Sequence, residues 1–192
     1  MSTYYFLPTR NVFGMGASQE AGELMKSLGG HKTMIVTDKF LHESGMAGQI
    51  QAILAQAGVE SIVFPGAEPN PTDQNVAAGV AVFQENGCDS ILSLGGGSSH
   101  DCAKGIGMVA ANGGTIHDYE GIDRSSRPLM PLMAVNTTAG TASEITRFCI
   151  ITDTSRKVKM AIVDWRVTPQ IAINDPELML SLIHISEPTR PY

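Results

Sequence analysis

The sequence predicts an α/β fold with a doubly wound, mostly parallel sheet that carries helices on both faces. Three observations support this class. Short apolar runs alternate with segments whose apolar residues recur at helical spacing. The connections between them are short, which favours parallel strands joined by crossover helices. One apolar run, at residues 90–94, ends in three consecutive glycines that would turn the chain into a helix.

The elements follow one another in a regular order. A small N-terminal hairpin is expected first, because residues 4–7 and 11–13 are strand-like and flank a Pro-Thr-Arg turn. After it, helices are expected at 17–28, 45–57, 72–86 and from residue 98 onward, and strands at 33–37, 61–64, 90–94, 131–135, 148–152, 158–163 and 170–174. Asp175 and Pro176 begin a last helix. The fold is therefore expected to be Rossmann-like.

The segment after residues 90–94 combines a turn with the start of a helix. Gly95, Gly96 and Gly97 lack Cβ atoms, so a ligand or another backbone can approach closely. Ser98 is expected to cap the helix, with Asp101 three residues later as in a capping box. Free N–H groups and the helix dipole would then form an anion site, typically for a pyrophosphate. A tight turn with a cap and no ligand fits the same residues, since the spacing matches neither the Gly-x-Gly-x-x-Gly nor the Walker pattern.

Other polar residues also follow strands, where ligands of such sheets bind. Asp38 comes directly after a strand and could accept hydrogen bonds from a ribose diol, or be an ordinary loop acid. Residues 136–144 carry hydroxyls and a glycine, which suits either a polar cradle or an exposed turn. Lys157 and Lys159 would share one face of a strand, either on a solvated edge or with one lysine at a ligand.

Composition excludes several classes of function. The chain has 192 residues, 43% of them hydrophobic, with a formal net charge of −6 and a pI of about 5.3. It has no basic stripe for nucleic acid and no apolar run near the ~18 residues of a membrane span. We expect no membrane partner and no signal peptide. Three cysteines without Cys-x-x-Cys pairing suit free thiols and a cytoplasmic location.

Four motifs in order resemble the iron-containing alcohol dehydrogenase family, over about residues 4–179. They are residues 35–38 (Ile-Val-Thr-Asp), 69–72 (Pro-Asn-Pro-Thr), 95–98 with Asp101 and Lys104, and 136–144. Lys159 and residues 175–179 extend the match. The chain is most similar to the branch that includes methanol and 1,3-propanediol dehydrogenases.

The resemblance implies a nucleotide-binding role for these motifs. It implies NAD as cofactor and reversible oxidation of a primary alcohol to an aldehyde, assisted by a divalent metal that is usually iron. A small alcohol or aldehyde is the implied substrate, and a homo-oligomer is expected. The positions that match the family's cofactor contacts are Asp38, Asn70, Gly96, Gly97, Ser98, Asp101, Thr137, Thr138, Thr146 and Lys159.

The sequence departs from the family pattern at its C-terminal end. The family's metal ligands, one Asp and three His, lie in a C-terminal helical domain that this chain lacks, so no metal ligand or catalytic residue is assigned here. His31, His42, His100 and His117 show no ligand spacing, and we expect them at the surface or near the cofactor at most. Residues 180–192 resemble a translated sequencing adapter, and Pro188 and Pro191 would break a helix. We therefore expect a dinucleotide-binding domain over residues 1–179 and a non-native tail over 180–192.

Two further interpretations remain open. The chain could be a stand-alone, non-catalytic dinucleotide-binding module, or belong to a related zinc polyol dehydrogenase. As a fragment of an alcohol dehydrogenase, it is expected to bind NAD weakly or not at all and to turn over nothing. The exposed apolar face left by a missing domain favours the fragment over the module, because such faces promote association.

Overall fold

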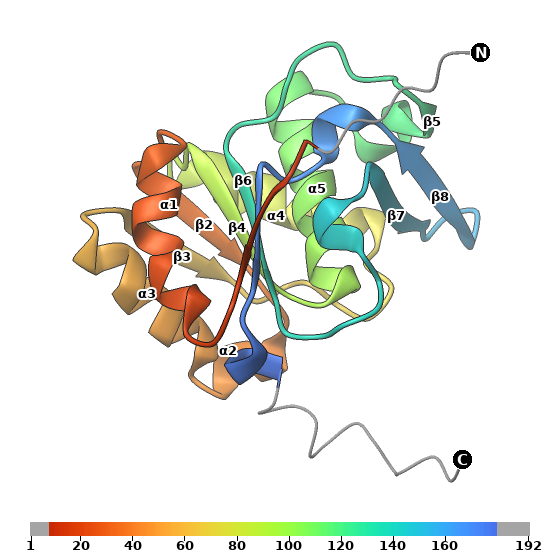
Figure 1. The fold of residues 1–192 in the computed structure, drawn as a ribbon. Helices are drawn as coiled ribbons and strands as arrows, with labels where there is room; N and C mark the ends of the chain where they lie inside the picture. The colour runs from red at the N-terminus through yellow and green to blue at the C-terminus, as the bar shows by residue number, and fades with distance from the viewer. Residues whose placement is uncertain (1–7, 180–192) are drawn as a thin grey trace, which may run out of the picture.

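The computed structural model describes residues 8–179 and shows the expected α/β architecture (Figure 1). A six-stranded parallel sheet has the order β1-β9-β6-β4-β2-β3. Its strands are β1 (Arg10–Phe13), β2 (Lys32–Val36), β3 (Glu60–Phe64), β4 (Ser90–Gly95), β6 (Leu132–Asn136) and β9 (Ile171–Asn174). The order reverses beside β2 and β4, as a doubly wound sheet requires.

Helices cover both faces of this sheet. On one face lie α1 (Ala21–Ser27) and α3 (Met46–Gln56), and on the other lie α4 (Asp73–Glu85) and α5 (Gly97–Asn112) (Figure 1). The shorter helices are η1 (Ala17–Glu20), α2 (Lys39–Glu43), η2 (Ile116–Tyr119), η3 (Ser143–Ile145) and η4 (Trp165–Val167). A further helix begins at Pro176. No helix within residues 8–179 combines the length and apolarity that crossing a bilayer requires.

The central strands are apolar throughout because both of their faces are covered. All residues of β4 and β6 are buried. Alternate side chains of each strand enter two separate cores. Met34 of β2 and Ile91 of β4 pack with α4 and α5, while Ile35 and Leu92 pack with α1 and α3.

A second, smaller sheet lies against α5, on the side away from β4. It has the order β5-β8-β7 and consists of β5 (Gly121–Ile122), β7 (Phe148–Asp153) and β8 (Val158–Val163). Strands β7 and β8 form an antiparallel hairpin. Both strands were expected from the sequence, but their separation from the main sheet was not. Helix α5 is buried along most of its length because a sheet covers each of two sides.

Three local expectations need correction. Residues 11–13 belong to β1, which pairs in parallel with β9 at one edge of the main sheet. The other half of the expected hairpin, residues 4–7, lies outside the described residues, as does the expected tail at 180–192. Helix α5 begins at Gly97 with Gly96 as its N-cap, so Ser98 and Asp101 form no capping box. Lys157 lies in the turn before β8 with φ of 56°, and only Lys159 is a strand residue.

Candidate functional site

Two adjoining cavities lie beyond the carboxyl ends of the parallel strands. One, of about 370 Å³, is lined by Asn70, Asp101, Thr146 and Lys159 among others. The other, of about 700 Å³, extends to Asp38, Pro69 and Thr138. Gly97 and Ser98 line both, so the first turn of α5 stands where the cavities meet. We call the first the Lys159 cavity and the second the Asp38 cavity.

The glycine turn brings backbone N–H groups to this junction. Gly95 has φ of 145°, a conformation that residues with a Cβ rarely adopt. A Cβ on Gly96 would lie 2.5 Å from Thr138 Oγ1, and one on Gly97 would lie 3.1 Å from Thr141 Cγ2. The loop after β6 therefore packs directly on the turn. Gly96 and Gly97 therefore have no room for a side chain of their own. The N-terminal N–H groups of α5 face the junction of the two cavities, an arrangement that suits an anion.

In the Asp38 cavity, Asp38 has a structural role that the sequence did not reveal. Its Oδ1 accepts a hydrogen bond of 2.8 Å from the Leu41 N–H and caps the short helix α2. This fixes the carboxylate at the end of β2, at the rim of the cavity. Phe40 of α2 is 54% exposed and lines the same cavity. A carboxylate beside an exposed aromatic ring suits a nucleoside.

In the Lys159 cavity, the loop before α4 meets the small sheet. Lys159 Nζ of β8 donates to Asn70 Oδ1 at 2.7 Å. Asn70 adopts a left-handed φ of 56°, and its N–H lies 3.4 Å from Ser98 Oγ. The Thr152 N–H of β7 donates to the Pro71 carbonyl at 2.8 Å. Three separate parts of the chain therefore hold the cavity's polar groups in fixed relation.

Beneath this cavity, Lys104 is fully buried and fastens the loop that forms one wall. Its Nζ donates to the carbonyl oxygens of Ser143, Thr146 and Phe148 at 2.6, 2.9 and 2.7 Å, and Ser143 Oγ lies at 3.0 Å. Burial lowers the pKa of Lys104, and the carboxylate of Asp101 opposes that shift. Lys104 belongs to one of the sequence motifs, but no role was expected for it. The available signal was an internal lysine on a helix with an apolar face.

Asp101 is held by the same loop. Its Oδ1 accepts from Ser143 Oγ at 2.7 Å, and its Oδ2 accepts from the Ile150 N–H at 3.1 Å. Burial raises the pKa of Asp101, and Lys104 opposes that rise. The carboxylate lines the cavity while both of its oxygens are already occupied. It therefore fixes the wall of the site.

Nine of the ten residues expected at the site line one or both cavities. The exception is Thr137, which is buried beneath the turn and whose N–H donates to the Gly95 carbonyl at 2.9 Å. Residues that the sequence analysis did not select also line the site, among them Phe40, Thr141 and Ser143. Thr141 and Ser143 lie in the polar segment at 136–144 that the sequence did single out.

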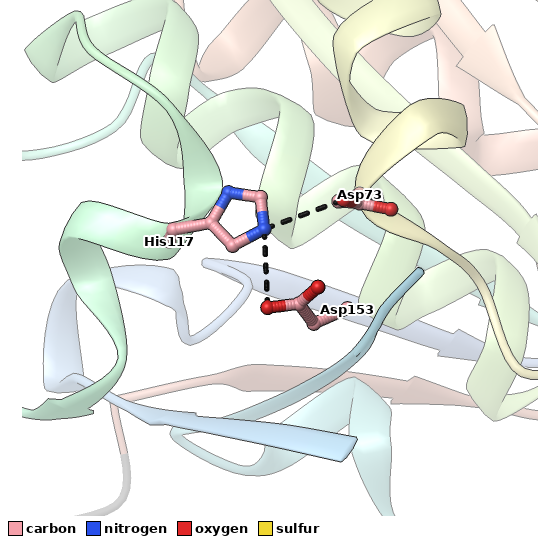
Figure 2. A group of neighbouring side chains, drawn as sticks. All are labelled: Asp73, His117 and Asp153. Carbon is pink, nitrogen blue, oxygen red and sulfur yellow. Dashed lines mark ion pairs between the residues drawn. The ribbon is translucent and has the colours of Figure 1, made fainter. Parts of the chain in front are cut away.

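A second polar cluster lies away from these cavities. His117 Nε2 of η2 lies 3.3 Å from Asp73 Oδ2 of α4 and 3.5 Å from Asp153 Oδ2 of β7, and Figure 2 shows the ring pointing between the two carboxylates. Among residues 8–179, these three side chains are the ones whose possible ligand atoms lie close enough together to bind one metal ion. The sequence showed no ligand spacing for His117 and placed it at the surface. The residue is exposed, and two carboxylates from distant parts of the chain lie beside it.

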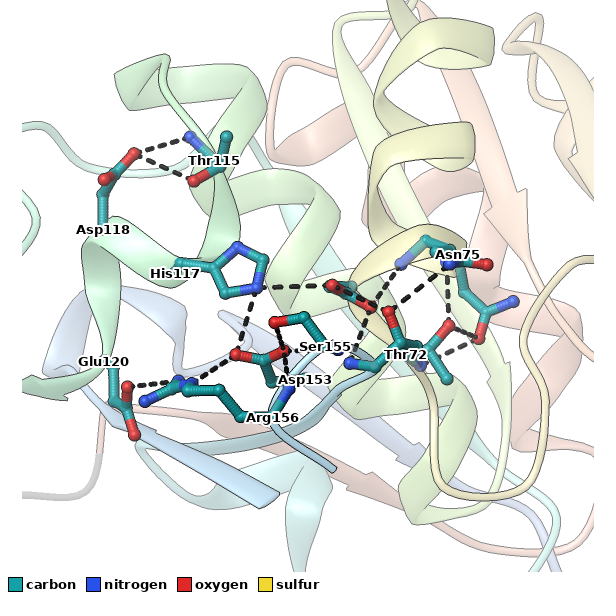
Figure 3. A network of polar contacts seen from close by, with 12 residues as sticks. Thr72, Asn75, Thr115, His117, Asp118, Glu120, Asp153, Ser155 and Arg156 are labelled. Atoms are coloured by element: carbon teal, nitrogen blue, oxygen red, sulfur yellow. Dashed lines mark hydrogen bonds and ion pairs between the residues drawn. The ribbon is translucent and has the colours of Figure 1, made fainter. Parts of the chain in front are cut away.

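The hydrogen bonds around Asp153 argue against a cation there. Its Oδ1 accepts from the Ser155 N–H, Ser155 Oγ and the Arg156 N–H, and its Oδ2 accepts from Arg156 Nε (Figure 3). These bonds hold the pKa of Asp153 well below its usual range. Arg156 also pairs with Glu120 at 2.7 Å. The Arg156 guanidinium thus already supplies positive charge at the oxygen that a metal would need.

Comparisons with known proteins agree with this geometry. A family model described as iron-containing alcohol dehydrogenase matches residues 8–176. The NAD-dependent methanol dehydrogenase of Bacillus methanolicus is 48% identical over 178 residues, which are 93% of this chain and 47% of that protein. The 1,3-propanediol dehydrogenase of Citrobacter freundii is 49% identical over 178 residues, 92% of this chain and 46% of that protein.

Solved structures give the same result. A 1,3-propanediol oxidoreductase aligns with a TM-score of 0.90 at 48% identity, covering 94% of this chain and 47% of the other. A sulfoacetaldehyde reductase from Bifidobacterium kashiwanohense, solved in complex with NAD+, aligns with a TM-score of 0.85 at 32% identity, covering 95% and 48%. The chain therefore spans about half the length of the curated relatives and solved structures that it matches.

Proposed function

The chain belongs to the iron-containing alcohol dehydrogenase family, and from this premise we propose that residues 8–179 bind NAD as part of an enzyme that oxidises a primary alcohol. The observation that carries the proposal is the junction at Gly97 and Ser98. There the N-terminus of a 16-residue helix meets two cavities that lie on either side of it. A dinucleotide has the matching form, with a pyrophosphate between two nucleosides.

The two cavities differ in their lining residues, and from this we infer which half of the cofactor each would hold. The Asp38 cavity takes the adenosine, with the Asp38 carboxylate toward the ribose diol and repelling a 2′-phosphate, which favours NAD over NADP. The Lys159 cavity takes the nicotinamide half. Asn70, Thr146 and Lys159 line it with polar groups that can orient a ribose and a carboxamide. Gly96, Gly97 and Ser98 border the pyrophosphate, and Thr138 packs on the turn from above.

The proposed reaction is a hydride transfer, and the family to which the chain belongs supports it. The alcohol carbon gives a hydride to the nicotinamide and the hydroxyl gives up a proton, so an alcohol and NAD+ become an aldehyde, NADH and H+. The described residues hold and orient the cofactor for that transfer. A divalent metal such as Fe2+, which the family name implies, would polarise the alcohol oxygen.

The residues present do not fit that metal. The lining of the Lys159 cavity contains one carboxylate, Asp101, and no histidine, and both Asp101 oxygens accept hydrogen bonds. We therefore propose that residues 8–179 do not hold the metal, and that its ligands come from the part of the relatives that this chain does not span. We further propose that the whole enzyme is a cytoplasmic homo-oligomer acting on a small alcohol or aldehyde.

The test is an NAD titration of the 192-residue chain in which saturation-transfer NMR, a method that detects weak binding, is the readout. Saturable transfer to the adenine and nicotinamide protons is expected. Gly96→Ala should abolish it, because the new methyl would lie 2.5 Å from Thr138 Oγ1. Gly48→Ala is the matched control, because it adds the same methyl at an exposed helical site with nothing within 4 Å.

Two results would count against the proposal. A folded wild-type chain that gives no transfer at millimolar NAD would overturn NAD binding by this chain. Alcohol-dependent NADH production by the purified 192-residue chain would overturn the proposal that the metal ligands lie in the part of the relatives that this chain does not span. A zinc polyol dehydrogenase would instead be indicated if a form extended to the length of the relatives required zinc and preferred a polyol.

A further inference from the structure

A fully buried histidine lies directly behind the glycine turn, outside both cavities. His100 is in the first turn of α5, 1% exposed, and its own N–H donates to the Gly96 carbonyl at 3.1 Å. Its Nδ1 lies 2.7 Å from Ser93 Oγ of β4, and its Nε2 lies 2.6 Å from Asn136 Oδ1 at the end of β6. The imidazole therefore joins the turn to the two strands that flank it.

These contacts continue across the sheet in a single line. Asn136 Nδ2 donates to Asn174 Oδ1 of β9 at 2.7 Å, and Asn174 Nδ2 donates to Asn11 Oδ1 of β1 at 3.4 Å. Five side chains thus connect four neighbouring strands, β4, β6, β9 and β1. The line begins in the buried centre of the sheet and ends at the exposed Asn11.

The hydrogen-bond directions along this line fix the state of the histidine. Because Asn136 uses its amide nitrogen on Asn174, its oxygen must accept from His100, so Nε2 carries a proton. Nδ1 is then free to accept from the Ser93 hydroxyl at 2.7 Å, and it lies closer to that hydroxyl than the Met133 carbonyl does at 3.4 Å. Every donor in the line points the same way, from Ser93 toward Asn11, and such chains strengthen cooperatively. An imidazolium would place a second proton at Nδ1 and turn the Ser93 hydroxyl away.

The line adjoins the parts of the site that hold the cofactor. Asn136 is the register partner of Gly95, and the next residue, Thr137, donates to the Gly95 carbonyl. Thr138 follows and sets the space above Gly96. A shift of Asn136 would therefore move both the turn and the loop that packs on it. This argument rests on the proposed function, because it concerns the same pyrophosphate site.

We propose that His100 is a positioning residue that acts as the neutral tautomer with its proton on Nε2. Its hydrogen bonds fix β4 and β6 relative to each other, and this in turn sets the positions of the glycine turn and Thr138 at the dinucleotide site. Burial favours the same neutral form, and the nearby charge of Lys104 on the same helix adds to that preference. The other side chains hydrogen-bonded to the ring, Ser93 from β4 and Asn136 from β6, carry no charge.

The first measurement reads the tautomer without any cofactor. Long-range 15N–1H NMR of the 192-residue chain, with His100 assigned by its loss in His100→Gln, should show a protonated Nε2 and an unprotonated Nδ1 from pH 5.5 to 8. Asn136→Asp should change this, because a carboxylate beside Nε2 stabilises the imidazolium. A proton on Nδ1 in the wild type, or protonation of its ring within this range, would overturn the proposal. This holds even if NAD does not bind.

The second measurement separates positioning from stability alone. His100→Gln keeps an acceptor for Ser93 and a donor for Asn136, whereas His100→Leu keeps only the approximate volume. At a temperature where both are folded, His100→Leu should weaken NAD binding about tenfold and His100→Gln no more than about threefold. His31→Gln, at an exposed site, is the matched control. A lower melting temperature for His100→Leu with unchanged NAD affinity would show that the residue only stabilises the fold and would overturn the positioning role.

Discussion

Lys159 Nζ donates to Asn70 Oδ1 at 2.7 Å and so connects the small sheet to the loop that enters α4. Both residues line the same cavity. Because the ammonium is exposed at the rim, it is available to a ligand and also holds Asn70 in its left-handed conformation. Lys157 and Lys159 therefore have different roles, since Lys157 lies in the turn between β7 and β8 and does not line the cavity.

Lys159→Ala is expected to weaken NAD binding about fivefold, which corresponds to one charge-assisted hydrogen bond near the surface. Lys157→Ala removes the same charge from the neighbouring turn and should leave the affinity within about twofold. Titrations at two salt concentrations check this prediction. Equal losses of affinity in the two variants would show that the lysines act only through non-specific electrostatic attraction to NAD. The proposed specific role of Lys159 would then be refuted.

Lys104→Met is expected to lower the free energy of unfolding by about 3 kcal/mol, because it removes the donor shared by the carbonyl oxygens of Ser143, Thr146 and Phe148. It also leaves Asp101 without its neighbouring cation. Urea denaturation monitored by circular dichroism measures the loss. Lys26→Met, at an exposed helical site, should change the free energy by less than about 0.5 kcal/mol.

A double variant tests whether Lys104 and Asp101 act together. If they do, Asp101→Asn combined with Lys104→Met should destabilise the chain by clearly less than the two single changes added together. Additive losses would mean that each residue acts only through its own hydrogen bonds to the Ser143 loop.

The strands could be predicted from the sequence because each buried strand is a short apolar run with a clear stop. The structure places β4 at Ser90–Gly95 and β6 at Leu132–Asn136, each within a residue or two of expectation. Thr72 and Asn75 form a full capping box at the start of α4, where a helix was expected to begin. Local patterns of apolar spacing and capping determine these features.

Side-chain partners could not be predicted in the same way, because they depend on residues far apart in sequence. Ser98 looked like an N-cap, but the preceding glycines allow the N-cap to lie two residues earlier, at Gly96. Asp38 caps α2, a five-residue helix with too few residues to show a periodic pattern. The contacts of Lys104 join residues about 40 positions apart, and those of Asn174 with Asn11 join residues 163 apart. Only the folded sheet brings these groups together.

The buried His100 predicts a specific acid sensitivity. Burial lowers its pKa to about 4, below the ~6.5 of an exposed histidine in the unfolded chain. As pH falls below about 6.5, the unfolded chain therefore takes up a proton that the folded chain refuses, so stability falls. The loss from this residue should reach about 3 kcal/mol by pH 4, and above about pH 8 it should contribute almost no slope.

Urea denaturation from pH 7 to pH 4 measures this loss as the difference between wild type and His100→Gln. The variant should have the shallower decline, since it lacks the titrating ring. Parallel declines in the two proteins would show that His100 protonates as readily in the folded chain as in the unfolded one.

The cluster of His117, Asp73 and Asp153 is expected not to bind a divalent metal, although its geometry brings three ligand atoms together (Figure 2). Arg156 donates to the Asp153 oxygen that faces His117, so a metal would have to displace a guanidinium as well as lose its own water.

Adding Zn2+ at micromolar concentrations should leave the melting temperature of the wild type unchanged. Arg156→Gln removes the competing charge, and this variant should gain a Zn2+-dependent rise in melting temperature that His117→Gln in the same background abolishes. A Zn2+-dependent rise in the melting temperature of the wild type that disappears in His117→Gln would contradict this prediction. It would show that the carboxylates bind the metal in preference to Arg156.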